Sequence, residues 1–340
     1  MILESFFPTK LSHVSLTVFI FLALCFGCSE NKPEQKICHR IGILCGVGYF
    51  ADTADGFKEK MSLLGYREGE TIIYDMQQVQ EDQDKRKLIL KKFVRDKVDL
   101  IFSFPTQTSL DAKAAVKGTN IPVVFANANI EGVDLVHNVR DPGGNISGVR
   151  YPGPQLAIKR FELMLEIVPH VKRMWIPYQK GYPIVDSQLK ALYAYAASLG
   201  ITFIEVPAAD AVDLKIAFKD RAPQYTGIEK DAVLIIAEPL AVNPEAFDVI
   251  GQFGDEYKIP VGGAMMVTRN HGSVFGVSTK NTAVGRQAAV IADKILKGEP
   301  AGKIPVVSAE SFLSINYKAA QKLGLEISEG LLSRADEIIR

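Results

Sequence analysis

The 340-residue sequence lacks a net charge, a metal-like spacing of histidines and the common catalytic motifs. It holds 39 lysines and arginines against 39 aspartates and glutamates, which argues against a nucleic-acid footprint or a basic membrane-binding face. The five histidines are scattered, so we expect no metal site. No G-x-S-x-G, Walker or H-E-x-x-H motif occurs, and no cysteine has a motif-like catalytic partner. The expected partner is a small molecule or another protein.

Cysteine is scarce, with four in the chain. Cys38 and Cys45 flank one expected strand, in which about 3.3 Å per residue holds them roughly 23 Å apart. A disulfide needs the two Cα atoms within about 7 Å. We therefore expect two free thiols rather than a bridge.

Apolar runs long enough to cross a membrane are missing after the N-terminus. The run at 14–27 (VSLTVFIFLALCFG) is shorter than the roughly 20 residues that a spanning helix needs, and the polar tract 29–36 follows it. It reads as an export signal. Gly27-Cys28 is similar to the end of a bacterial lipoprotein signal, although Cys25 stands where leucine is usual. Lipidation of Cys28, ordinary cleavage nearby and a retained anchor all stay open, and each places the mature protein outside the cytoplasm.

Hydrophobic residues make up 47% of the chain, enough for a large core and about two domains. From Ile41 onward, β-branched runs alternate with amphipathic stretches, which predicts parallel sheets with crossover helices. The first series has strands at 41–44, 71–75, 98–104 and 121–126 and helices at 52–64, 84–97 and 106–117. After a turn-rich linker at 141–148, the second has helices at 154–168, 184–199, 211–221 and 244–257 and strands at 173–177, 201–207, 232–238 and 259–264. A strand at 274–278, a helix at 281–297, a strand at 304–307 and a segment at 312–325 complete both series.

Gly46, Gly48 and Ala51 form a G-x-G-x-x-A pattern after the first expected strand, and Asp75 ends the second. This arrangement is typical of dinucleotide-dependent oxidoreductases. It leaves the export signal and the second α/β series unexplained, so we retain it as an alternative.

Two spaced motifs carry a more specific resemblance. Residues 141–149 (DPGGNISGV) are similar to R-P-G-G-N-x-T-G-V, and residues 285–298 (GRQAAVIADKILKG) are similar to G-R-Q-A-A-x-x-A-x-x-I-L-K-G. Both motifs belong to the ABC-transporter substrate-binding family that includes tryptophan- and tyrosine-binding lipoproteins. Segments 121–126, 169–172 and 304–324 support the match, which covers most of residues 40–330. The chain therefore resembles this family.

The resemblance implies an α/β type I periplasmic-binding-protein fold: two Rossmann-like lobes with parallel sheets, joined by a three-crossing hinge. The implied organisation is a signal at 1–28, a linker at 29–36, lobe 1 at 37–148 and 279–307, and lobe 2 at 149–278 and 308–340. It also implies an extracytoplasmic, non-enzymatic protein that binds a solute, best a hydrophobic or aromatic amino acid, without a cofactor. The protein would close around the solute for an ABC permease. A sensor-side binding protein of the same fold is a further alternative.

In this fold the ends of the strands from both lobes face the ligand, which predicts the binding residues. From lobe 1 we expect Gly48, Tyr49, Phe50, Ser103, Phe104, Thr106, Gln107 and Asn127. Tyr49 or Phe50 would stack on a ligand ring, and the helix start near Thr106 would receive an anion. The open alternatives are packing of Phe50 in its own lobe and simple capping of that helix. Phe104 departs from the family, which often has a small hydroxyl residue there.

From lobe 2 we expect Tyr178, Gln179, Glu238 and Gly263. Glu238 would pair with a cationic group of the ligand, unless it is solvated or paired within its own lobe. Gly263 would leave room for the ligand. The single tryptophan, Trp175, lies in an apparent buried strand and is expected in the core.

Overall fold

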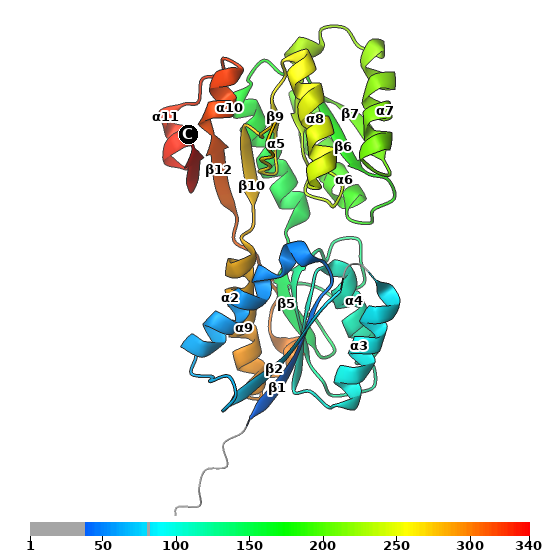
Figure 1. The fold of residues 1–340 in the computed structure, drawn as a ribbon, viewed down its shortest axis with the longest axis vertical. Coiled ribbons are helices and arrows are strands. Elements are labelled where there is room, and N and C mark those ends of the chain that lie inside the picture. Colours follow the sequence, from blue (N-terminus) through cyan, green and yellow to red (C-terminus); the bar gives the residue numbers. More distant parts are fainter. Residues whose placement is uncertain (1–37, 80–81) are drawn as a thin grey trace, which may run out of the picture. The chain divides into compact units, whose positions relative to one another are not determined.

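The computed structural model describes residues 38–79 and 82–340 (Figure 1). The predicted export signal and Cys28 lie outside the described residues. Within these ranges, no helix has both the length and the apolar character that a membrane crossing requires.

A six-stranded, fully parallel sheet organises the part of the protein that we call lobe 1. Its strand order is β11-β5-β4-β3-β1-β2. The strands are β1 (His39–Cys45), β2 (Ile72–Gln78), β3 (Leu100–Phe104), β4 (Val123–Ala128), β5 (Ile146–Arg150) and β11 (Val307–Ser308). Helices α2 (Asp52–Leu63) and α9 (Asn281–Leu296) pack on one face of the sheet and form a hydrophobic core with it (Figure 1). Helices α3 (Gln83–Arg95) and α4 (Thr106–Ala115) form a second core with the other face. Both faces of the sheet are therefore covered.

This double cover explains the composition of the central strands. Every residue of β3 and β4 is buried, and strands buried on both faces are expected to be continuous apolar runs instead of alternating ones. Local signals fix the helix ends; Asp82, for example, caps α3 by accepting a hydrogen bond from the Lys85 amide at 2.9 Å.

The rest of the described chain, which we call lobe 2, has two sheets with strand orders β7-β6-β8-β9 and β10-β12-β13. Gly263 joins the two sheets, because its amide donates to Phe275 and its carbonyl accepts from Val277. The strands are β6 (Arg173–Gln179), β7 (Thr202–Ala208), β8 (Ala232–Leu234), β9 (Val261–Gly262), β10 (Phe275–Ser278), β12 (Phe312–Asn316) and β13 (Glu337–Ile339). The helices are α5 (Gly153–Ile167), α6 (Val185–Ala196), α7 (Ala211–Arg221), α8 (Pro244–Tyr257), α10 (Tyr317–Lys322) and α11 (Glu329–Ser333).

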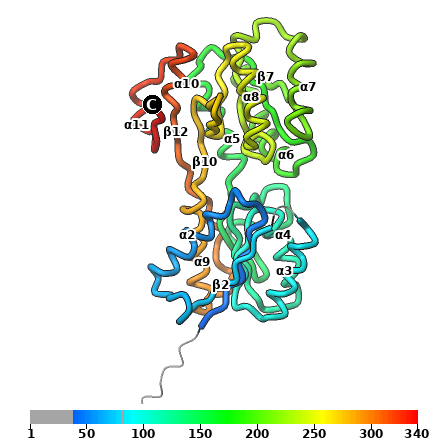
Figure 2. The backbone as a smooth tube through the Cα atoms, viewed as in Figure 1, coloured from blue at the N-terminus to red at the C-terminus, as the bar shows by residue number. Residues whose placement is uncertain are grey.

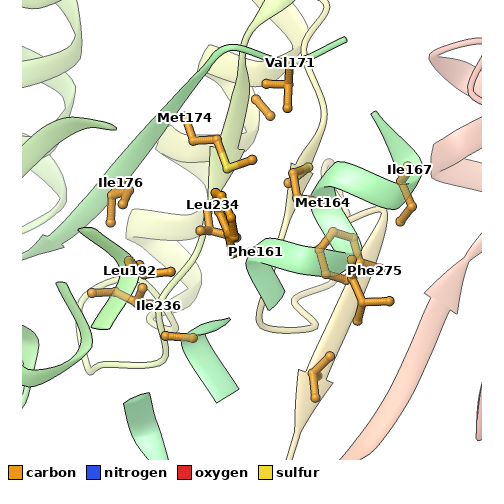
Figure 3. Close-up of a cluster of buried hydrophobic side chains, with 14 of the residues drawn as sticks. Phe161, Met164, Ile167, Val171, Met174, Ile176, Leu192, Leu234, Ile236 and Phe275 are labelled. Carbon is orange, nitrogen blue, oxygen red and sulfur yellow. The ribbon is translucent and has the colours of Figure 1, made fainter. Parts of the chain in front are cut away.

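Lobe 2 has a core on each side of its larger sheet. Helices α5 and α6 contribute to one core, drawn in Figure 3, where Phe161 and Met164 of α5 lie among side chains of the strands. Helices α7 and α8 contribute to the other. Trp175 lies in this second core, fully buried, and its indole N–H donates to Asp231 at 2.8 Å. The prediction that Trp175 is a core residue is confirmed.

The chain passes between the lobes three times, after β5, after β10 and after β11, and Figure 2 allows the path to be followed. Arg160, fully buried in α5, connects the first two passages. Its guanidinium donates to the Tyr151 hydroxyl at 2.6 Å, just beyond β5, and to the Val277 carbonyl in β10 at 2.6 and 2.9 Å. One side chain therefore fixes two crossings to the same helix.

Most predicted elements occur within a few residues of their expected positions. The linker predicted at 141–148 is correct for residues 141–145, but residues 146–148 belong to β5. The predicted strand 232–238 ends early, at Leu234, and the segment 312–325 divides into β12 and α10. Short 3-10 helices also occur: η1 (Gly48–Phe50), η2 (Ala197–Leu199), η3 (Ala222–Gln224), η4 (Ile228–Lys230) and η5 (Ala301–Lys303).

The two described cysteines are free, as predicted. Cys38 is exposed, whereas Cys45 is buried at the end of β1. Burial raises the pKa of the Cys45 thiol, so packing and not reactivity is its role in the fold.

Candidate functional site

In lobe 1, three loops follow the carboxyl ends of β1, β3 and β4, which are neighbours in the sheet. Such ends are where open parallel sheets bind ligands. Hydrogen bonds join the loops. The Gly46 amide donates to the Phe104 carbonyl at 2.8 Å, and the Asn129 amide donates to the Thr106 hydroxyl at 3.0 Å. The edge is therefore one connected surface.

The loop after β1 carries an exposed aromatic side chain. Gly48, Tyr49 and Phe50 form η1. Tyr49 is 67% exposed, while Phe50 packs on the lobe 1 core. Their rings meet edge to face, with centroids 5.0 Å apart and an interplanar angle of 87°, a favourable aromatic geometry. The core therefore supports Phe50, and Phe50 supports Tyr49.

The loop after β3 is more deeply buried than predicted. Ser103 and Phe104 are fully buried, and Phe104 packs against Phe102 in the core. Gln107 instead points to the surface and donates to Asp111 at 3.2 Å. No side chain caps the start of α4, where Pro105 is the N-cap residue, so amide groups of its first turn have no side-chain partner. This helix start retains the anion-binding character that the sequence indicates.

Asn127 is the second-last residue of β4 and has a left-handed backbone conformation, with φ of 48°, which asparagine tolerates better than most residues. Its amide nitrogen donates to the Thr53 hydroxyl at 2.8 Å and to the Asn281 side-chain oxygen at 3.4 Å. Asn281 in turn donates to the Tyr49 carbonyl at 2.9 Å. Asn127 thus belongs to a polar network beneath the aromatic loop.

The glycine pattern after β1 has a packing explanation. A Cβ atom on Gly46 would lie 1.9 Å from the Thr108 hydroxyl oxygen, so α4 leaves no room for a side chain. Asp75 lies inside β2, three residues before its end, and pairs with Lys92 and Gln77. The carboxylate on which the dinucleotide alternative relies is therefore already engaged.

In lobe 2, the predicted residues also follow strand ends. Tyr178 and Gln179 end β6, and Glu238 comes four residues after β8. The Tyr178 hydroxyl donates to Glu205 on the neighbouring strand β7. Gly263 has φ of 125°, and a Cβ atom there would lie 2.3 Å from the Ile235 carbonyl oxygen. Only glycine fits this position.

Glu238 is buried, with 3% of its surface exposed. Its carboxylate accepts hydrogen bonds from the amides of Gln179 at 3.0 Å, Leu240 at 3.1 Å and Ala241 at 2.6 Å. Burial raises the pKa of Glu238 to about 6, against the opposing effect of these three N–H groups. Glu238 thereby links the end of β6 to the loop that follows β8.

The structure thus brings Gly48, Tyr49, Phe50, Thr106 and Asn127 to one edge of lobe 1. It places Ser103 and Phe104 beneath that edge and Gln107 outside it, and it assigns Tyr178 and Glu238 partners within lobe 2. Their roles toward a ligand stay predictions. Sequence reasoning missed Thr53 and Asn281; the only available signal was that Asn281 begins the helix predicted at 281–297. Among residues 38–79 and 82–340, no group of three or more His, Cys, Asp or Glu side chains is arranged to hold a metal ion.

Comparisons with known proteins agree that this chain is similar to substrate-binding proteins. A family model described as ABC transporter substrate binding protein matches residues 49–339. A tyrosine-binding protein of Clostridioides difficile is 24% identical over 331 residues, covering 93% of each chain.

Solved structures share the fold. An ABC domain from Streptococcus pneumoniae in complex with L-Trp is 23% identical, with a TM-score of 0.75 over 88% of this chain and 99% of the other. A ligand-free, open structure of a substrate-binding protein with adhesive properties from Clostridium difficile is 23% identical, with a TM-score of 0.70 over 88% and 98%.

Proposed function

Since the chain belongs to the ABC transporter substrate-binding protein family, we propose that it binds an aromatic amino acid and delivers it to an ABC permease. The exposed Tyr49 ring, supported edge to face by Phe50 at the carboxyl edge of the sheet, is the observation that carries this proposal. An aromatic ligand gains both apolar burial and ring contact on such a surface. The tyrosine-binding relative and the L-Trp-bound structural neighbour favour the same ligand class.

The amino-acid backbone of the ligand also has a suitable partner. The uncapped start of α4 provides amide donors for a carboxylate. The lobe 2 residues Tyr178, Gln179, Glu238 and Gly263 would complete the site from the other side when the lobes close. The three crossings supply the hinge for this motion.

No chemical step is part of this function. The protein would act outside the cytoplasm, attached to the membrane through a lipidated Cys28, and the permease would recognise its closed form. Family membership and the sequence of the export signal support this placement.

The test is a thermal-shift screen of the purified mature chain with L-tyrosine, L-tryptophan, L-phenylalanine, other amino acids, nucleosides, sugars, NAD and FAD. A ligand that binds only the folded state raises the melting temperature by mass action. We expect a shift with at least one aromatic amino acid and none with NAD or FAD. Co-purification of a dinucleotide, or hydride transfer, would refute the transport function.

A response to a sugar or nucleoside alone would keep the transport function but overturn the aromatic ligand. Isothermal titration of the strongest responder then gives its stoichiometry. One solute per chain is expected.

A further inference from the structure

We propose that Asn281 is a positioning residue that fixes the loop carrying Tyr49 to the crossing between β10 and α9. The polar network beneath the loop supplies the argument, and the consequence for ligand binding rests on the proposed function.

Asn281 is the first residue of α9 and follows directly on the two residues, 279–280, that connect it to β10. It does not cap its own helix, since the N-cap residue is Lys280 and no side chain makes a capping bond there. Its side chain instead leaves the helix and bonds to residues far away in sequence.

The orientation of the Asn281 amide follows from its partners. The Tyr49 carbonyl can only accept, so the amide nitrogen must face it, at 2.9 Å. The amide oxygen then faces the Asn127 side-chain nitrogen at 3.4 Å, which is a consistent donor. Asn127 is anchored in turn to Thr53 at 2.8 Å. The chain of hydrogen bonds thus runs from Tyr49 through Asn281 and Asn127 to the start of α2.

The beginning of α9 is itself held firmly. A Cβ atom on Gly56 would lie 2.0 Å from the Thr282 carbonyl oxygen, and one on Gly285 would lie 2.0 Å from the Thr53 carbonyl oxygen. The two helix backbones therefore touch at Thr282 and Gly285, in the first turns of α9 directly after Asn281. Because its backbone is held against α2, the Asn281 side chain can hold the Tyr49 loop in a fixed position next to the crossing.

The consequence is that Asn281 holds the Tyr49 loop in a fixed place on lobe 1, at the end of the crossing. When the crossing bends, the aromatic surface keeps this place, so that the order of the loop and the affinity for the solute are coupled. Without the Asn281 bond, the hydrogen bonds of Tyr49 and its two neighbours are the local 3-10 ones, in which the Phe50 amide donates to Val47 and the Ala51 amide donates to Gly48.

Asn281→Asp tests this role with minimal change of shape. A carboxylate still accepts from Asn127 but has no donor for the Tyr49 carbonyl, while a negative charge in the first turn favours α9. A purely structural role in the helix therefore predicts unchanged or raised stability and an unchanged loop. The positioning role predicts that the Phe50 and Ala51 amides exchange with deuterium about tenfold faster, while the amides of α9 remain protected.

Asn281→Gln, which keeps the amide donor on a longer side chain, should restore part of the protection. Asn243→Ala provides the matched control, because Asn243 caps α8 in lobe 2 through the amides of Glu245 and Ala246. It should lower the melting temperature and leave the loop amides unchanged. Wild-type exchange at Phe50 and Ala51 in Asn281→Asp would overturn the proposal.

Titration with L-tyrosine and L-tryptophan forms the second arm. Affinity for whichever of them binds the wild type should fall about five- to tenfold in Asn281→Asp and stay unchanged in Asn243→Ala. If neither binds the wild type, the aromatic-ligand assignment fails, and the exchange measurement still decides the role of Asn281. Faster loop exchange with unchanged affinity would overturn the coupling to the solute.

Discussion

At the residue scale, side chains that follow the carboxyl edge of the lobe 1 sheet point in different directions. Tyr49 was predicted to be available to a ligand and is largely exposed. Phe104 was predicted beside it and is fully buried. On a strand covered on both faces, a residue at the carboxyl end can turn to either core, and apolar patterning does not distinguish these directions. Hydrogen bonds such as Asn281 to Tyr49, across 232 positions, leave no local pattern at all.

Tyr49→Ala should weaken binding of the aromatic amino acid about tenfold, because it removes the ring contact and the apolar surface. The unliganded protein should melt at the wild-type temperature, since this side chain is exposed. Calorimetric titration and thermal unfolding measure the two effects. The control is Tyr195→Ala in lobe 2, whose hydroxyl bonds to Glu162; equal weakening by both variants would remove Tyr49 from the site.

Glu238 should make stability depend on pH. Its folded pKa of about 6 lies above the ordinary value of 4.5, so the folded state holds the proton more tightly than the unfolded state. Its contribution to the unfolding free energy, about 2 kcal/mol, is therefore full below about pH 4.5 and is lost as the pH rises through about 6.

Glu238→Gln removes this titration. We expect the unfolding free energy of the wild type to fall by about 2 kcal/mol relative to that of the variant from pH 4.5 to pH 7. Urea unfolding at both pH values measures it. A difference that is independent of pH would show that the pKa of Glu238 is not raised.

At the element scale, long periodic segments were predictable and short polar ones were not. The helices at 211–221 and 244–257 have the predicted boundaries. β5 was missed because its sequence, ISGVR, follows Gly143 and Gly144, both with positive φ, and reads as a continuation of the turn. Its pairing with β4 makes it a strand, and Gly148 is required there because a Cβ atom would lie 2.2 Å from the Phe125 carbonyl oxygen.

The contact between α2 and α9 should be sensitive to single methyl groups. Gly56→Ala places a Cβ atom against the Thr282 carbonyl and should lower the unfolding free energy by about 2 kcal/mol. Gly330→Ala is the control, since it lies in α11 with open space around it, and should be neutral or slightly stabilising. Chemical denaturation measures both. Equal stability of the two variants would contradict the close approach of the helix backbones.

At the scale of the whole molecule, the fold could be predicted because two α/β series and two spaced motifs agreed on one architecture. The site could not, since it depends on how two lobes meet around a solute. The prediction that belongs here concerns closure. Saturation with the aromatic amino acid that binds should reduce the radius of gyration measured by X-ray scattering, and an unchanged radius at full occupancy would exclude hinge closure.

The three crossings also determine when the protein finishes folding during its synthesis. The lobe 1 core needs α9, which begins 229 positions after α2, and the lobe 1 sheet ends with β11 at Val307–Ser308. The smaller sheet of lobe 2 includes β13, at Glu337–Ile339, which pairs with β12. Lobe 1 is therefore complete only after the ribosome has made residue 308, and lobe 2 only after residue 339. Contacts between such distant positions form slowly, so the nascent chain keeps both lobes open until late in its synthesis.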